Sequence, residues 1–158
     1  MKKPSSIILV LALIALSFQT KSQDVTRQAS CYDSSLKFQA DSVKMAFYNQ
    51  GFVVVKEAAM TMESEYEMPV VVPLNQGSLY QFVFIGDKSS KLYEVRMFDY
   101  GEKQVMYEKR YGNGVESNVI SYSYIPKFSE YHMIKPVQVN NKKKKNICGY
   151  IMLMKKIN

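Results

Sequence analysis

Few side chains in this 158-residue chain have the types and spacing that catalysis requires. The single histidine, His132, lies between Tyr131 and Met133 in a stretch that reads as a β-strand. Serine triads need a histidine as general base, and histidine-rich zinc sites need at least two such ligands. A lone histidine is usually a surface or core residue. The sequence therefore predicts no catalytic residues, no metal site and no cofactor, and a protein that is not an enzyme.

One enzymatic alternative stays open at this point. Glu94 and Asp99 are two carboxylates that lie close in the sequence, and they are candidates for the acid pair of a glycosidase. Such a pair works only where the two carboxyl groups face each other across a sugar. This reading therefore requires both side chains in one cleft.

Tyrosine is the residue type whose excess most suggests binding, with 12 tyrosines and no tryptophan in the chain. A tyrosine ring joins an apolar body to a polar hydroxyl, which suits it to ligand stacking and to interfaces. The predicted ligand-binding residues, on one sheet face, are Tyr107, Tyr111, Tyr122 and Tyr124. The same alternation also fits the inner face of a core. If these tyrosines form an exposed row, they favour a sugar-binding face, whereas buried tyrosines would rule out that role.

A run of four lysines forms the strongest charge feature of the chain. The formal net charge is +7 at pH 7, and it falls to +4 without the lysines at positions 2, 3 and 21. Basicity is therefore concentrated in one loop, formed by Lys142, Lys143, Lys144 and Lys145. This loop either binds an anion, such as anionic lipid or glycan, or is a solvated hairpin tip that blocks edge-to-edge pairing.

The first 22 residues have the three parts of a secretory signal peptide, which predicts cleavage near Ser22. A basic start precedes the apolar residues 7–18, and Thr20 and Ser22 supply small side chains. A helix over 7–18 would rise about 18 Å, too short to cross a bilayer comfortably. We expect a secreted or periplasmic protein with no membrane span in the mature chain and no nucleic-acid partner. An uncleaved membrane anchor is the alternative.

Both cysteines, Cys31 and Cys148, lie beyond the predicted signal peptide. An even number of cysteines in an exported chain favours a disulfide over free thiols. This bond would tie the beginning of the mature chain to its last strand. Two buried thiols, acting as small core residues, are the alternative.

The apolar periodicity predicts one helix followed by about eight strands. Leu36, Ala40, Val43 and Phe47 recur at helical spacing over 34–49, and Gly51 follows. The period then changes to two. The predicted strands are 52–62, 66–74, 79–85, 91–99, 104–111, 119–125, 130–137 and 147–154. Strand 79–85 is apolar on both faces, which predicts cover on both sides. Its short polar connection to 91–99 predicts a hairpin, and the prolines of 66–74 predict an edge strand.

Short connections without βαβ alternation favour a mainly β fold. We predict one domain over 23–158, an antiparallel β-sandwich of jelly-roll type with the amphipathic helix packed on a sheet face. The chain length is sufficient for one substantial core.

The order of these elements resembles that of the pre-peptidase C-terminal family of secreted jelly-roll domains. The resemblance is carried by Tyr80-Gln-Phe-Val-Phe, by Val95-Arg-Met-Phe-Asp-Tyr-Gly101 and by Cys148-Gly-Tyr-Ile-Met-Leu. It covers about residues 77–153 and implies a binding or accessory module. The N-terminal helix departs from the usual domain of that family. The leader is similar to those of exported Bacteroidetes proteins, which bears on compartment alone.

Together these observations predict a secreted, non-enzymatic β-sandwich that acts as a binding or accessory module at the cell envelope. Its partner would be a protein or a glycan. The alternative is a carbohydrate-binding module that uses tyrosines on one sheet face.

Overall fold

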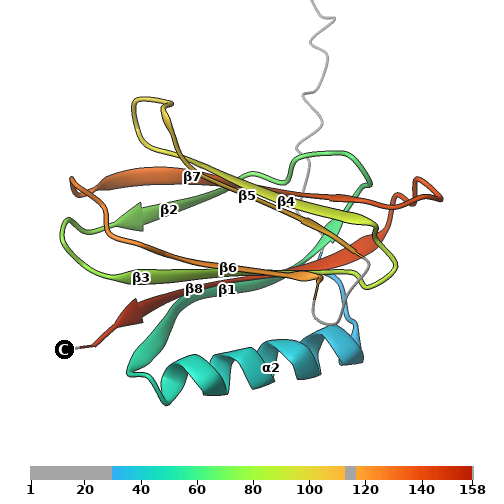
Figure 1. The fold of residues 1–158 in the computed structure, drawn as a ribbon, viewed down its shortest axis with the longest axis horizontal. Helices are drawn as coiled ribbons and strands as arrows, with labels where there is room; N and C mark the ends of the chain where they lie inside the picture. Colours follow the sequence, from blue (N-terminus) through green and yellow to red (C-terminus); the bar gives the residue numbers. More distant parts are fainter. Residues whose placement is uncertain (1–29, 113–116, 158) are drawn as a thin grey trace, which may run out of the picture.

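The computed structural model describes residues 30–112 and 117–157, so the predicted signal peptide over 1–22 lies outside the described residues. One helix precedes eight strands along the described chain (Figure 1). They are α2 (Ser34–Tyr48), β1 (Phe52–Met62), β2 (Val70–Leu74), β3 (Tyr80–Gly86), β4 (Leu92–Phe98), β5 (Gln104–Tyr111), β6 (Val119–Tyr124), β7 (Glu130–Val139) and β8 (Ile147–Lys156).

The eight strands form two four-stranded antiparallel sheets that pack face to face (Figure 1). We call the sheet with order β1-β8-β3-β6 sheet A, and the sheet with order β2-β7-β4-β5 sheet B. This order is that of a jelly roll, and it confirms the predicted fold class. Among the described strands, β4 and β5 are the only consecutive pair joined in one sheet. Every other connection crosses from one sheet to the other.

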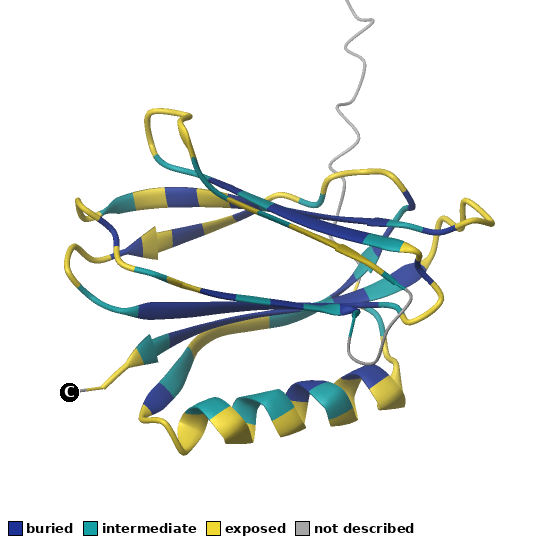
Figure 2. Ribbon diagram, viewed as in Figure 1, coloured by how far each residue is buried: buried dark blue, intermediate teal, exposed yellow. Residues whose placement is uncertain are grey.

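The main core lies between the sheets and is built from alternate residues of each strand. Tyr80, Phe82 and Phe84 of β3 face this core, where they meet Tyr93 and Val95 of β4. Figure 2 shows buried residues along the strands of both sheets. Tyr93, Val95 and Met97 therefore form the inner face of β4.

The helix covers the outer face of sheet A, as the sequence predicts (Figure 1). Asp33 caps its N-terminus, because the Asp33 carboxylate accepts a 2.9 Å hydrogen bond from the Leu36 amide. Leu36 and Ala40 pack against Val83 and Ile85 of β3. Strand β3 is therefore buried on both faces, since the helix covers the side that does not meet the main core.

The predicted hairpin between the third and fourth strands is wrong. Strand β3 pairs with β6 and β8, whereas β4 pairs with β5 and β7. The polar connection instead carries the chain from sheet A to sheet B. Strand β2 is an edge strand, as its prolines predict, and Pro73 lies within it. Pro69 stands outside β2, although Met68 still donates its amide to the Pro136 carbonyl.

The Tyr93 side chain holds the β3–β4 connection in place. The ring is fully buried, and its hydroxyl lies 2.7 Å from the Asp87 carbonyl oxygen and 2.9 Å from that of Ser90. Burial, together with the charge of Asp87, raises the pKa of Tyr93 to about 12. The neutral phenol is therefore held in place by the fold.

This raised pKa predicts a loss of stability in alkali. The folded protein retains the Tyr93 proton up to about pH 12, whereas an unfolded tyrosine loses it near pH 10. Stability from this group is complete below pH 10 and is lost as pH rises toward 12, by about 3 kcal/mol in total. Urea unfolding followed over this range measures the slope. The Tyr93→Phe variant should start less stable at neutral pH and decline less steeply, and parallel slopes would contradict the assignment.

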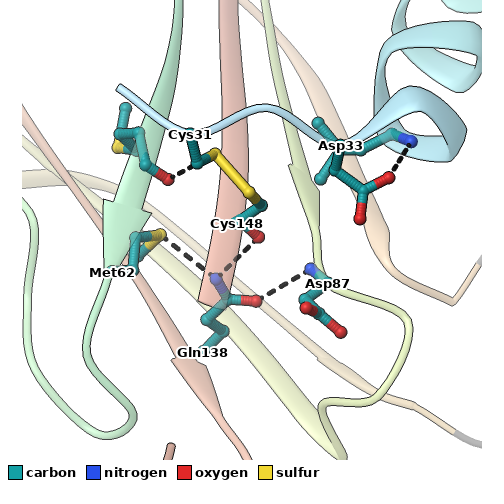
Figure 3. The surroundings of a disulfide bond; sticks show 8 residues. Cys31, Asp33, Met62, Asp87, Gln138 and Cys148 are labelled. Atoms are coloured by element: carbon teal, nitrogen blue, oxygen red, sulfur yellow. Dashed lines mark hydrogen bonds between the residues drawn. A yellow bond between two sulfur atoms is a disulfide. The ribbon is translucent and has the colours of Figure 1, made fainter. Parts of the chain in front are cut away.

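Cys31 and Cys148 form a disulfide, which confirms the predicted pairing (Figure 3). Their Cα atoms are 5.8 Å apart, and 117 positions separate them in the sequence. The bond attaches the segment before α2 to β8, which lies between β1 and β3 within sheet A.

A buried amide lies beside this disulfide (Figure 3). Gln138 of β7 is inaccessible to solvent. Its Oε1 accepts from the Asp87 amide at 2.9 Å, and its Nε2 donates to the Cys148 carbonyl at 3.0 Å. Gln138 therefore joins sheet B to the β3–β4 connection and to β8 of sheet A at one point.

Candidate binding face

The two outer faces of the sandwich differ in what covers them. Helix α2 packs on sheet A, whereas no helix lies on the outer side of sheet B in the described structure (Figure 2). We call the outer side of sheet B the open face. Strand register assigns to it Val71 and Pro73 of β2, Tyr131, Met133 and Lys135 of β7, Glu94, Arg96 and Phe98 of β4, and Tyr107, Lys109 and Tyr111 of β5.

A network of ion pairs occupies the middle of the open face. Arg96 Nε donates to Glu94 Oε1 at 2.8 Å, and Arg96 Nη1 pairs with Glu67 Oε1 at 3.0 Å. Lys135 Nζ reaches the other oxygen of Glu67 at 3.1 Å. The hydrogen bond to Glu94 raises the pKa of Arg96 above its usual value. Two cations balance two carboxylates, so the middle of the face is polar, ordered and close to neutral.

Large apolar and aromatic side chains flank this network on both sides. Tyr107 and Tyr111 of β5 are 46% and 63% exposed. Val71 and Met133 are also exposed on the side of β2 and β7, where they are register partners. Exposed apolar side chains that gather on one face mark interaction surfaces. The open face can therefore stack against a ligand and hydrogen-bond to it.

The four predicted ligand-binding tyrosines do not form one row. Tyr107 and Tyr111 belong to β5 of sheet B, whereas Tyr122 and Tyr124 belong to β6 of sheet A. Tyr122 points into the core with only 6% exposure, and its hydroxyl lies 3.7 Å from Met97 Sδ. The single row predicted on one sheet face is therefore wrong, because β5 and β6 lie in different sheets. The ligand-binding role of Tyr107 and Tyr111 stays a prediction.

Tyr124 meets the single histidine inside the sandwich. Its hydroxyl lies 3.2 Å from His132 Nε2, and His132 is almost fully buried. Burial raises the pKa of Tyr122 and of Tyr124 above the usual value for tyrosine. His132 is inaccessible to a substrate in this position.

The two carboxylates considered as a glycosidase pair, Glu94 and Asp99, both bond to other groups of the protein. Glu94 binds Arg96, and the Asp99 carboxylate accepts a 2.9 Å hydrogen bond from the Lys103 amide in the β4–β5 turn. Within residues 30–112 and 117–157, no three histidine, cysteine or acidic side chains gather as metal ligands.

Lys142, Lys143, Lys144 and Lys145 are exposed in the loop that follows β7. Because β7 and β8 lie in different sheets, this loop links the sheets and is not a hairpin tip. The Lys144 carbonyl accepts from the Ser64 amide at 2.9 Å. Anion binding by these lysines stays a prediction.

Two exposed tyrosines at one end of sheet B, Tyr100 and Tyr131, are not among the predicted ligand-binding residues. The alternation of β7 was a usable signal, because buried His132 and Ile134 place Tyr131 and Met133 on the opposite face. Tyr100 lies in the turn after β4, where apolar periodicity does not indicate which way a side chain points.

No family model matches this chain, and no curated protein matches it. Solved structures with a similar arrangement include a structure described as "CBM4 structure and function", with 11% identity, TM-score 0.42, and coverage of 67% of this chain and 79% of that one. TmCBM61 in complex with β-1,4-galactotriose has 14% identity, TM-score 0.37, and coverage of 68% and 83%. The K1 cleaved adhesin domain of Lys-gingipain from Porphyromonas gingivalis W83 has 12% identity, TM-score 0.37, and coverage of 63% and 74%. Similarities this loose leave the function of this chain to be argued from its own residues.

Proposed function

We propose that the protein is a non-enzymatic binding or accessory module of the cell envelope, and that it binds its partner on the open face. One observation carries the proposal: α2 covers the outer side of sheet A, while the outer side of sheet B exposes tyrosines around an ordered polar network. Exposed aromatic side chains that gather around polar groups on one face are typical of an interaction surface.

The disulfide supports an exported protein. Disulfides persist in oxidising compartments such as the periplasm and the cell exterior, and Cys31–Cys148 is one. The predicted signal peptide agrees with this compartment. None of the helices in the described part of the chain has the length and hydropathy of a bilayer span.

The positions of the titratable groups support a non-enzymatic role. General acid–base catalysis needs a proton donor or acceptor within hydrogen-bond reach of the substrate. His132 is buried inside the sandwich, and the Glu94 carboxylate on the open face is occupied by Arg96. The ordered charges of the open face suit recognition better than proton transfer.

Carbohydrate is the second candidate, as the ligand of the same face. The observation that favours it is the placement of Tyr107 directly beside Arg96 in the strand register, so that an aromatic ring adjoins hydrogen-bonding groups. Sugars offer both an apolar C–H face and hydroxyl groups, and they suit such a mixed surface.

The double variant Tyr107→Ala/Tyr111→Ala tests the open face. We expect at least about a tenfold loss of affinity, because each removed ring contributes roughly 0.5–1.5 kcal/mol of contact. The purified, oxidised protein is screened on a glycan array and by crosslinking to envelope proteins, and affinity is then measured for the best binder.

Phe38→Ala is the matched control, because Phe38 is an exposed aromatic residue on the helix side of the molecule. Its affinity should equal that of the wild type. Equal affinity of all three proteins, or a loss confined to Phe38→Ala, would overturn the open face as the binding surface.

A further inference from the structure

A hollow of about 440 Å³ lies at one end of sheet B, where β2 ends, β7 begins and the β4–β5 turn approaches them. Its volume falls within the range of small-molecule sites, roughly 300–1,000 Å³. The residues that line it include Pro73, Asn75, Tyr100, Ser129, Glu130 and Tyr131. All of them lie in the described chain, and Tyr131 and Pro73 also belong to the open face.

The apolar part of the hollow consists of two tyrosines and a proline. Tyr100 and Tyr131 are 75% and 58% exposed, and Pro73 is the register partner of Tyr131. The two tyrosines come from separate elements, the β4–β5 turn and β7, yet both border the same space. Exposed aromatic rings that share a concave site are suited to stack on a flat apolar ligand surface.

The polar part of the hollow is anchored by the fold. The Ser129 hydroxyl accepts a 2.9 Å hydrogen bond from the Gln76 amide, which holds the two connecting segments together. Glu130 lies in β7 opposite Leu74 of β2, and its carboxylate is partly exposed. One oxygen of that carboxylate stands 3.8 Å from Nε2 of the buried His132. The Glu130 carboxylate therefore lies at the border of the hollow, and its exposed part can accept hydrogen bonds.

We infer that this hollow is a binding site for one pyranose ring of a neutral sugar. The apolar C–H face of the ring stacks on Tyr131 and Tyr100, and its hydroxyls donate to Glu130 and bond to the side-chain amide of Asn75. Carboxylate acceptors suit hydroxyl donors, whereas the negative charge of Glu130 disfavours an acidic sugar. This inference rests on the proposed binding function, of which it names one ligand class and a site.

The test is an NMR titration of isotope-labelled, oxidised protein with methyl glycosides of glucose, galactose, mannose and N-acetylglucosamine. At least one of them should produce saturable shifts in the amides around Tyr100, Ser129 and Tyr131. Tyr131→Ala and Tyr100→Ala should each weaken that binding about tenfold. Tyr131→Phe retains the ring and should retain binding, which separates stacking from any loss of folding. Titration with an oligosaccharide that contains the same sugar shows whether the site binds a free monosaccharide or one unit of a longer chain.

Charge selectivity is tested with the methyl glycoside of glucuronic acid. Wild-type protein should bind it more weakly than the glucoside, and Glu130→Gln should reduce that preference. Phe38→Ala, on the helix side of the molecule and outside the hollow, should leave monosaccharide binding unchanged.

The failure of this inference is distinguishable from that of the proposed function. No saturable shifts at the hollow with any glycoside, or shifts that survive both tyrosine-to-alanine changes, would overturn the sugar site. The proposed binding role of the open face would then still be tested separately, by the affinity of the Tyr107→Ala/Tyr111→Ala variant for the partner found in the screen.

Discussion

Replacing Cys31 and Cys148 together by alanine is expected to lower the free energy of unfolding by about 5 kcal/mol. The bond closes a loop whose ends are 117 positions apart, and a crosslink of that span removes a large part of the conformational freedom of the unfolded chain. Because folded domains are commonly stable by only about 5–15 kcal/mol, this change removes much of the total. Urea unfolding of the oxidised wild type and the double variant measures it.

Two controls identify the source of that loss. Wild-type protein unfolded under reducing conditions should resemble the alanine variant, since both lack the same crosslink. The urea m-value should be larger without the bond, because the unfolded chain then exposes more surface. A stability difference below about 1 kcal/mol would contradict the entropic account.

Replacing Gln138 by leucine is expected to lower the free energy of unfolding by about 3–4 kcal/mol. Leucine fills similar space, but it leaves the Asp87 amide and the Cys148 carbonyl without the hydrogen bonds that Gln138 makes. A buried polar group without a partner costs about 1–3 kcal/mol. Urea unfolding measures the loss, and hydrogen exchange should show faster exchange at the Asp87 amide.

Gln81→Leu is the matched control, because Gln81 is also a buried glutamine in a strand. Its side chain bonds to the Ser121 and Ser123 hydroxyls, which lie closer to solvent and can turn to water instead. The control should therefore lose clearly less stability than Gln138→Leu. Equal losses would show that burial alone, and not the position of Gln138 between the sheets, sets the cost.

The sequence predicts the elements of this fold well, because residue periodicity reports which faces are buried. The stripe of Leu36 and Ala40 identifies the helix face that packs on sheet A. Strand β3 is apolar on both sides because the core covers one side and the helix covers the other. Such patterns are local and can be read without knowing the neighbours of a strand.

Strand partners were harder to predict, because alternation specifies a face and not a neighbour. The polar residues after β3 fit a hairpin turn equally well as a crossing between sheets. In the structure, Tyr93 and Gln138 hold the crossing by hydrogen bonds to the Asp87 backbone. The same ambiguity explains the tyrosine row. Tyr107 and Tyr122 alternate in the same way within their strands, yet one faces solvent from sheet B and the other faces the core from sheet A.

The hollow could not be predicted from the sequence, because it depends on which segments meet in the fold. Tyr100 and Tyr131 meet only because the β4–β5 turn and the start of β7 converge at one end of sheet B. No spacing in the sequence joins these two residues. The contribution of β7 to the open face could have been found, since Tyr131 and Met133 alternate with buried residues in that strand.

The position of the disulfide also determines how the domain responds to mechanical force. Tension applied between residue 30 and residue 157 passes from Cys31 directly into β8, so the segment between the two cysteines carries no load. With the bond intact, the chain can lengthen only over the residues beyond Cys148, to a reach of roughly 40 Å. Reduction would release the closed loop and extend that reach to roughly 450 Å. An oxidised module of this kind therefore acts as a short, nearly inextensible link.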